Sequence, residues 1–408
     1  MMAQAPGRLE MPRLYRVRQR FDDTCLDDAA GALHAELDRS GVLVRVKPGM
    51  EVALAVGSRG IRGLAALVRA LGERIRERGA LPFVVPAMGS HGGATAEGQA
   101  AVLAGYGVTP GGVGMEIRSS MDVVPLGRTA SGVPVHIDAL AHAADLIVPV
   151  NRVKPHTDFW GPVGSGLCKM LSVGLGNHVG CAALHRRGFE AFPALIPEAA
   201  AFVIEHARVG FGVAVVENAY DKTLLLRAIP AERILQEEPG LLALAQAHMP
   251  GILLPEIDLL IVRRFGKDLS GTGMDPNVTG RALCGTPPGF SGPAVRRILV
   301  ESLTPLSHGN ACSIGMADYL LSSCFRQVDW QVTHLNAVAS GCPEGERVPR
   351  QVARAEDVLP SLMAERSAKT PGRLRVVRID STLDLGVIEA SEALLPQVRA
   401  DGRLALLD

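Results

Sequence analysis

The 408-residue chain lacks the features that mark secreted, membrane and nucleic-acid-binding proteins. Its seven cysteines are scattered and odd in number, with no Cys-x-x-Cys pair, which argues against a disulfide framework and a structural zinc site. Basic and acidic residues number 42 each, so no global positive field exists to hold nucleic acid or an anionic membrane. No uninterrupted apolar run approaches the roughly 18 residues of a membrane span, and Arg8–Arg20 lacks the apolar stretch of a signal peptide. We therefore expect a cytoplasmic protein that acts on small molecules.

Apolar runs alternate with amphipathic segments from residue 51 onward. Strand-like runs occupy residues 52–56, 81–85, 144–150, 210–216 and 258–262. Between the first two runs, apolar residues recur at the three- and four-residue spacing of one helix face: Leu64, Leu67, Val68, Leu71 and Ile75. Gly79 ends this predicted helix, and Thr95 is a candidate N-cap for the next one. Repeated strand–loop–helix units predict an α/β fold with mostly parallel sheets.

Length and punctuation predict two α/β domains. A chain of this length exceeds a single core, and Met249–Pro255 contains two prolines and a glycine that interrupt a helical stretch. We assign residues 1–250 to an N-terminal domain that carries the histidine loops and the candidate cofactor lysine. Residues 255–408 form a C-terminal domain that closes an interdomain cleft, where we expect the pocket. In parallel sheets, ligands bind at the carboxyl ends of strands, where the strand order reverses.

Two histidine loops follow predicted strands. Met88–Thr95 surrounds His91 with small residues, and Asn151–His156 ends in the second histidine. Because histidine titrates near neutrality, two such side chains in one cavity would form an acid/base pair. In the alternative structural interpretation, the ring of His91 only caps a strand end, and the neighbouring glycines supply positive φ.

The glycine-rich run Gly161–Lys169 is typical of loops whose backbone N–H groups approach an anion. A phosphate-loop NTPase is disfavoured, because two residues separate Gly166 from Lys169 and Met170 replaces the magnesium-binding hydroxyl. Lys169 beside backbone donors is a candidate nucleophile, and a solvated surface lysine is the alternative.

His178 and His185 lie seven residues apart, on one face if the segment is helical. That separation is too wide for both to bind one metal easily, so we expect one metal ligand. No cluster here has zinc spacing, and a metal held by a single histidine would take most of its donors from a cofactor.

Two further motifs give weaker signals. Ala311–Gly315 is the nearest match to the nucleophile elbow of a serine hydrolase, but His334 follows too soon to leave room for the acidic member. Gly271–Pro276 resembles the start of a dinucleotide fingerprint whose third glycine is replaced by Pro276. We interpret this second loop as cleft lining.

The order and spacing of these motifs resemble the nickel-pincer lactate racemase family, the LarA-like hydroxyacid racemases and epimerases. The matching series is His91, then Pro155-His156, then the glycine-rich run to Lys169, then His185 sixteen residues further. The resemblance covers nearly the whole chain and is strongest over Val56–His185 and Gly266–Asn310.

The resemblance implies a nickel-pincer nucleotide, a pyridinium-3-thioamide-5-thiocarboxylic acid mononucleotide that carries nickel. It would be joined to Lys169 through a thioamide, with Ser90, Gly164 and Gly166 as further cofactor contacts. His185 would be the nickel ligand, and His178 the fallback.

The same resemblance assigns the substrate contacts. His91 and His156 would flank the reacting carbon of a 2-hydroxy acid as an acid/base pair, while hydride moves reversibly to the cofactor. Arg59 would hold the substrate carboxylate, and Lys267 and Asn277 are candidate contacts from the second domain. Arg281 and Trp330 are further candidates there.

The chain departs from the family pattern in the substrate-contacting segments. Gly57–Gly60 replaces an acidic residue and a Thr-Arg-Pro run, Gly166–Lys169 replaces Gly-Gly-Arg/x-Lys, and Leu171–Gly174 replaces Ile-Leu-Pro-Gly. We therefore expect a racemase or epimerase of a small 2-hydroxy acid, and these departures argue against lactate as its substrate. Its partners would be the cofactor-biosynthesis proteins, with a homo-oligomer as a candidate assembly. The alternatives are a nucleotide-dependent oxidoreductase and a non-catalytic anion- or nucleotide-binding protein that uses the same cleft.

Overall fold

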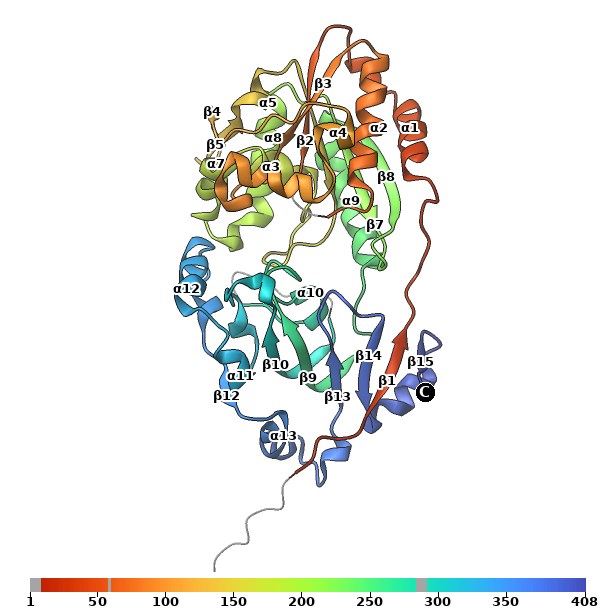
Figure 1. The fold of residues 1–408 in the computed structure, drawn as a ribbon, viewed down its shortest axis with the longest axis vertical. Helices are drawn as coiled ribbons and strands as arrows, with labels where there is room; N and C mark the ends of the chain where they lie inside the picture. The colour runs from red at the N-terminus through yellow and green to blue at the C-terminus, as the bar shows by residue number, and fades with distance from the viewer. Residues whose placement is uncertain (1–8, 58–59, 284–291) are drawn as a thin grey trace, which may run out of the picture. The chain divides into compact units, whose positions relative to one another are not determined.

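The computed structural model describes residues 9–57, 60–283 and 292–408, which form two compact units (Figure 1). The N-terminal unit is Asp22–Met249, and the C-terminal unit combines Pro250–Asp408 with the residues up to Phe21. The chain passes from one unit to the other twice, after Phe21 and after Met249. The second of these boundaries coincides with the predicted break near residue 250. Assigning the chain from residue 1 to the N-terminal domain is wrong for the stretch that ends at Phe21, because its strand pairs in the other sheet.

The N-terminal unit is built on a five-stranded sheet with the order β3-β2-β6-β7-β8. Its strands are β2 (Glu51–Val56), β3 (Leu81–Pro86), β6 (Leu146–Arg152), β7 (Phe211–Glu217) and β8 (Thr223–Pro230). The first four strands in this order are parallel, and β8 is an antiparallel edge strand. The predicted strand runs and the mostly parallel α/β architecture are confirmed.

Side-chain alternation along the strands separates two apolar layers. Ala53 and Ala55 of β2 face one layer, while Val52, Leu54 and Val56 face the other. On the second face lie α1 (Ala29–Ser40), α2 (Leu64–Glu77), α3 (Ala96–Gly105) and α4 (Pro110–Val113). On the first face lie α5 (Ala139–Ala143), α6 (Leu167–Lys169), α7 (Asn177–His185), α8 (Phe192–His206) and α9 (Ile234–His248), with the hairpin β4 (Val123–Arg128) and β5 (Pro134–Asp138). Covering both faces explains why these strands are apolar throughout.

Helix ends follow the predicted signals. The amide of Gly79 donates to the carbonyl of Arg76 at φ +78°, a conformation that favours glycine, and α2 ends beside it. At the start of α3, the hydroxyl of Thr95 accepts a hydrogen bond from the amide of Gly98 at 3.0 Å. Both sequence predictions are confirmed.

The strand order reverses beside β2. From β2 the chain crosses to β3 on one side, and it then returns past β2 to β6 on the other side. The carboxyl ends of β2 and β6 are therefore neighbours whose following loops diverge, which opens a crevice at this edge of the sheet.

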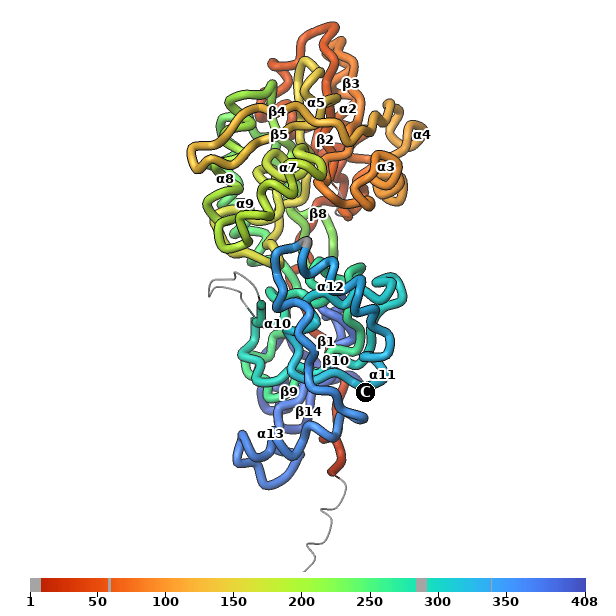
Figure 2. Tube along the Cα trace, turned by 90° about the vertical axis from the view of Figure 1, so that its left-hand side faces the viewer, coloured from red at the N-terminus to blue at the C-terminus, as the bar shows by residue number. Residues whose placement is uncertain are grey.

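The C-terminal unit contains an eight-stranded mixed sheet with the order β12-β11-β10-β9-β13-β14-β1-β15. Its strands are β1 (Leu14–Gln19), β9 (Glu256–Phe265), β10 (Ala294–Leu303), β11 (Tyr319–Leu321), β12 (Arg350–Val352), β13 (Val376–Ile379), β14 (Val387–Ser391) and β15 (Leu404–Leu406). Its helices are α10 (Pro276–Thr279), α11 (Ser322–Phe325), α12 (Trp330–Ala339), α13 (Leu359–Arg366) and α14 (Leu395–Ala400). The first five strands in this order pair parallel, and the last three, β14, β1 and β15, pair antiparallel. The N-terminal strand β1 therefore belongs to the same sheet as the C-terminal strands (Figures 1 and 2).

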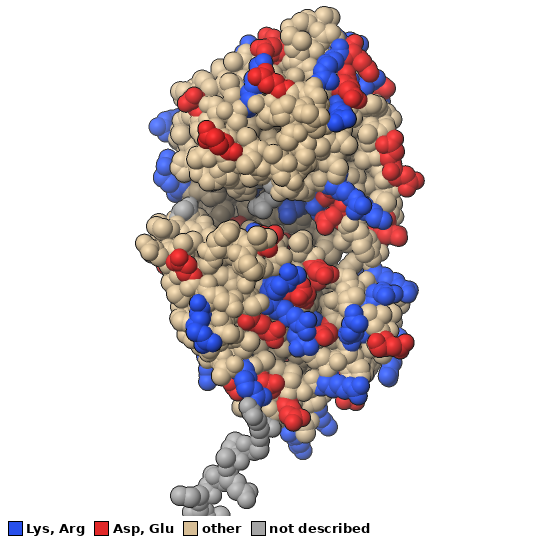
Figure 3. Space-filling view, in the orientation of Figure 1, with Lys and Arg blue, Asp and Glu red and all other residues tan. Residues whose placement is uncertain are grey.

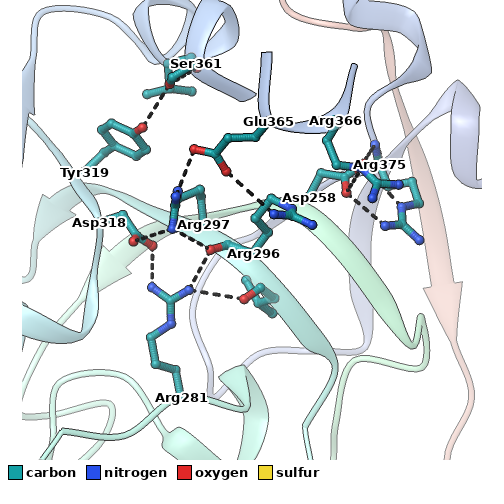
Figure 4. A network of polar contacts seen from close by, with 12 residues as sticks. Asp258, Arg281, Arg296, Arg297, Asp318, Tyr319, Ser361, Glu365, Arg366 and Arg375 are labelled. Atoms are coloured by element: carbon teal, nitrogen blue, oxygen red, sulfur yellow. Dashed lines mark hydrogen bonds and ion pairs between the residues drawn. The ribbon is translucent and has the colours of Figure 1, made fainter. Parts of the chain in front are cut away.

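Arg281 belongs to an ion-pair network near the amino ends of β10 and β11 (Figure 4). Its guanidinium pairs with the carboxylate of Asp318 and donates to the carbonyls of Val295 and Arg296 at 3.1 and 2.9 Å. These contacts connect the chain after α10 to the starts of two strands. Arg281 therefore has a structural role at the end of the sheet opposite to the carboxyl edge.

Charges of both signs are mixed over the described surface of each unit that Figure 3 shows. No helix in the described ranges is long and apolar enough to cross a membrane. Cys342 is disulfide-bonded, which its spacing in the sequence does not indicate, whereas Cys168 and Cys181 are among the free cysteines.

Strand β1 provides a test of how the chain divides. Val17 is completely buried between β14 and β15, so Val17→Ala should lower the free energy of unfolding by about 2 kcal/mol. Hydrogen–deuterium exchange should become faster in β9, β13 and β14 but not in β2, β3 or β6. The exposed neighbour change Arg18→Ala serves as the control. Faster exchange in the N-terminal unit instead would contradict this grouping.

Candidate functional site

A pocket of about 620 Å³, which includes its open mouth, lies at the carboxyl ends of β2, β3 and β6. Its walls are Gly57, Ala87, Met88, Ser90, His91, Asn151, Ser165, Lys169, Met170, Val173, Gly174, Cys181 and His185. The pocket is formed within the N-terminal unit, at the reversal of strand order, and it brings Ser90, His91, Lys169 and His185 together.

Lys169 ends α6 and is followed at once by the π-helical turn Met170–Gly174. Such turns are rare and often occur at functional sites. Asn151, at the end of β6, donates from Nδ2 to the carbonyl of Gly166 at 3.0 Å. The segment that ends at Lys169 is thus tied to a strand end, and Lys169 is one of the residues that line the pocket.

Glu238 of α9 binds the same segment through its side chain. Its Oε2 accepts a hydrogen bond from the amide of Cys168 at 2.8 Å, and complete burial raises the pKa of this carboxyl group to about 7. A Cβ atom on Gly166 would lie 2.3 Å from Oε1 of Glu238. Gly166 is therefore required for the close approach of the two segments. Gly164 is similarly restricted, since a Cβ there would meet the carbonyl of Lys154 at 2.6 Å.

The His91 loop is docked onto the π-helical turn. The amide of Gly89 donates to the carbonyl of Gly174 at 3.0 Å, and Nε2 of Gln99 donates to the carbonyl of Gly89 at 2.9 Å. Gly92 has φ +67°, and a Cβ there would lie 2.6 Å from the amide nitrogen of Gln99. These contacts place the exposed side chain of His91 at the pocket wall.

His156 contacts Lys169 and is not among the residues that line the pocket. Its Nε2 is 2.5 Å from Nζ of Lys169, and its Nδ1 accepts a hydrogen bond from the amide of Asp158 at 3.0 Å. The ring is 9% exposed and stacks on Phe159 with a centroid distance of 4.4 Å. The structure therefore brings both predicted acid/base histidines to one site, but only His91 lines the pocket.

His185 is oriented by its own helix. Its Nδ1 donates to the carbonyl of Cys181 at 2.7 Å, which leaves Nε2 as the ligating nitrogen. The ring also packs edge-on against Phe189 and Phe192. Burial disfavours charge on both Cys181 and His185, but their contact at 3.4 Å lowers the pKa of the thiol and raises the pKa of the imidazole.

Within the described ranges, no three histidine, cysteine or carboxylate side chains are grouped so as to hold a metal. His178, the fallback ligand, is exposed on α7 and does not line the pocket. His185 is therefore the better placed of the two predicted metal ligands.

The structure does not test the remaining predicted substrate contacts. Arg59 is outside the described residues. In the C-terminal unit, Nζ of Lys267 donates to the carbonyl of Gly271 at 2.8 Å, and Nδ2 of Asn277 donates to the carboxylate of Asp275 at 2.9 Å. Their roles as substrate contacts remain predictions.

The loop that contains Arg59 is fixed at its far end by Glu217, at the end of β7. The amide of Arg62 donates to Oε1 of Glu217 at 2.7 Å, and the other carboxylate oxygen pairs with Arg152. Burial raises the pKa of Glu217, while Arg152 acts in the opposite direction. The end of β7 thus joins those of β2, β3 and β6 in holding the chain around the pocket.

Comparison with known proteins accounts for this site. Residues 32–192 match the sequence profile of the lactate racemase N-terminal domain, and the match contains His91, His156, Lys169 and His185. This segment belongs to the lactate racemase family. The structure of the lactate racemase apoprotein from Thermoanaerobacterium thermosaccharolyticum is similar to the chain at 14% identity and a TM-score of 0.49, covering 74% of this chain and 71% of that one. No curated protein matches the chain. The assignment made from the motifs is confirmed at the level of the family.

Sequence reasoning missed several residues that hold the loops around the pocket. Gln99 and Glu238 lie inside helices and belong to no motif, so only the folded chain shows that they hold the two loops. Asn151 directly follows an apolar strand run, and this position was the one signal that could have identified it. Cys181 precedes His185 by one helical turn, a spacing that places the two side chains together.

The buried carboxyl group of Glu238 predicts a pH dependence of stability in the N-terminal unit. Its folded-state pKa of about 7 exceeds the ordinary value of 4.5, so its contribution is fully present below pH 4.5 and is lost as pH rises to about 7. The loss should reach up to about 3 kcal/mol. In Glu238→Gln the amide imitates the neutral acid, so this component should disappear. Urea unfolding of both proteins between pH 4.5 and 8 measures it, and a pH-independent difference between them would contradict the assignment.

Proposed function

We propose that this chain is a cytoplasmic racemase or epimerase of a small 2-hydroxy acid that uses a lysine-anchored nickel-pincer nucleotide. One observation carries the proposal: a single pocket at the switch point of a parallel sheet joins His91, Lys169 and His185, with His156 in contact with the lysine. Membership of the lactate racemase family supports the reaction class.

The residues present fit the cofactor. Lys169 offers an amine at the pocket wall, and His185 offers Nε2 because its Nδ1 is occupied by a backbone carbonyl. Ser90 adds a hydroxyl at the same wall. When bound, the nickel-pincer nucleotide would supply a reversible hydride acceptor. A single protein ligand suffices where the cofactor provides the other donors.

The chain's own part in the reaction is proton transfer and positioning. Racemisation needs the hydroxyl proton of the substrate to be taken and returned on either side of a planar 2-keto acid, and therefore needs two acid/base groups. His91 is exposed at the pocket wall and is placed to act as one of them. His156 is the second candidate, and Arg59 is the proposed carboxylate contact.

Covalent loading gives the first test. Protein made together with the cofactor-building proteins should gain the mass of the nucleotide on Lys169 and contain nickel. Lys169→Met should gain no mass, whereas His185→Phe should retain the covalent mass but lose nickel, because it lacks the metal-binding nitrogen. Intact-mass spectrometry and metal analysis measure the two separately.

The exposed-histidine change His178→Phe is the matched control and should retain both signals. Unmodified wild-type protein without nickel under these conditions would overturn the cofactor assignment.

Turnover gives the second test. Loaded protein should interconvert the enantiomers or epimers of at least one 2-hydroxy acid in a panel followed by chiral chromatography. His91→Gln should lower the rate by roughly 10²- to 10⁴-fold, the usual contribution of a general acid or base, while His178→Gln should leave it unchanged. Net oxidation that depends on added NAD(P) would favour an oxidoreductase instead. Ligand binding without turnover would favour a binding protein.

A further inference from the structure

The contact between Lys169 and His156 determines where the protons are. Nζ of Lys169 and Nε2 of His156 are 2.5 Å apart, so one of the two nitrogens must donate and the other must accept. An ammonium group has three donors and no acceptor, whereas a neutral amine has a lone pair. The protonation state of Lys169 therefore follows from which nitrogen of the ring carries hydrogen.

The contact made by the other ring nitrogen, Nδ1, indicates which nitrogen of His156 carries the hydrogen. Nδ1 of His156 accepts a hydrogen bond from the backbone amide of Asp158 at 3.0 Å, so it carries a lone pair. A neutral imidazole with a lone pair on Nδ1 has its hydrogen on Nε2. Nε2 is then the donor in the contact with Lys169. The lysine must accept, which only its uncharged form can do.

Packing keeps both partners in this arrangement. The His156 ring stacks on Phe159 at 4.4 Å and lies 6.2 Å from the ring of Phe189, and it is 9% exposed. The backbone amide of Cys168, the residue before Lys169, donates a hydrogen bond to the carboxyl group of Glu238. A ring packed in this way is held in one orientation, so the identity of its donor nitrogen is fixed by the fold.

We propose that His156 is a positioning residue that holds Lys169 as an uncharged amine, so that Lys169 is a ready nucleophile for an activated acyl carbon. The identity of the acyl group rests on the proposed function, while the state of the amine rests on the hydrogen bonds alone. Sequence spacing shows neither, because thirteen residues separate the two side chains.

The covalent step is an acyl transfer. The lone pair of Nζ forms the new C–N bond, the bond from the acyl carbon to its leaving group breaks, and that group leaves with the bonding electrons. One N–H proton passes to water. The nitrogen of the amide-type product no longer offers a lone pair, so Nε2–H of His156 loses its acceptor.

Competitive acetylation with trace acetic anhydride tests the proposal on cofactor-free, full-length protein at pH 7. Lys47, Lys222 and Lys369 are exposed and serve as internal standards. An ordinary lysine is an amine in only about one molecule in 2,000 at this pH. Lys169 should therefore be acetylated at least tenfold faster than each standard, as measured by peptide mass spectrometry. The reaction forms an amide and releases acetate and a proton.

Two variants separate the cause. His156→Phe keeps an aromatic ring on Phe159 but has no nitrogen, so the relative rate at Lys169 should fall at least tenfold. His178→Phe, which introduces the same side chain at an exposed site, should leave the rate unchanged. A Lys169 rate no higher than that of the standards, or a rate unaffected in folded His156→Phe, would overturn the proposal.

A second measurement is made on the wild-type protein and therefore does not require that His156→Phe folds. In wild-type protein labelled with ¹⁵N-lysine, the Nζ resonance of Lys169, assigned by its loss in Lys169→Arg, should have the shift of a free amine. An ammonium shift would overturn the proposal. Neither measurement involves nickel or the nucleotide. Rapid acetylation in a protein that never gains cofactor mass would therefore contradict the proposed function alone.

Discussion

The site depends on how the backbone of Gly166–Gly174 is held. Three buried polar contacts fix it: Asn151 binds the carbonyl of Gly166, Glu238 binds the amide of Cys168, and the amide of Gly89 binds the carbonyl of Gly174. Each contact comes from a different element, namely a strand end, a helix and the His91 loop. Unsatisfied polar groups are costly in such an environment, so these partners restrain the segment more strongly than apolar packing alone would.

The position of this segment follows from the topology of the sheet. Because the chain leaves β2 toward β3 and returns past it to β6, the loops after β2 and β6 diverge and leave a crevice. The backbone of Ser165, in the glycine-rich run just before this segment, pairs with that of Lys154, which follows β6. Helix α7 comes soon after this segment in the chain. The anchor lysine and the metal-ligand candidate are thus brought to one crevice by a single continuous stretch of chain. The His91 loop arrives separately, from β3.

Patterns that reside in one short segment were predictable from the sequence, and pairings across the fold were not. Short continuous apolar runs identified β2, β3, β6, β7 and β9, and the side chain of Thr95 identified the start of α3. The membership of β1 in the far sheet depends on partners about 370 residues away, which no local pattern encodes. Gln99 and Glu238 have ordinary helical surroundings in the sequence, and their buried polar contacts exist only in three dimensions. The mutual orientation of His156 and Lys169 has the same origin.

That orientation bears on the order of events at the site. A histidine whose Nε2–H is bound to a lysine amine cannot at the same time donate to a substrate oxygen, so in this state His91 and His156 are not equivalent. Acylation of the lysine removes the competing lone pair without any movement of the ring. Loading of the anchor and release of the second acid/base group would then be one event. If the proposed function holds, a protein without the group on Lys169 lacks the hydride acceptor, and His156 remains in contact with the lysine amine.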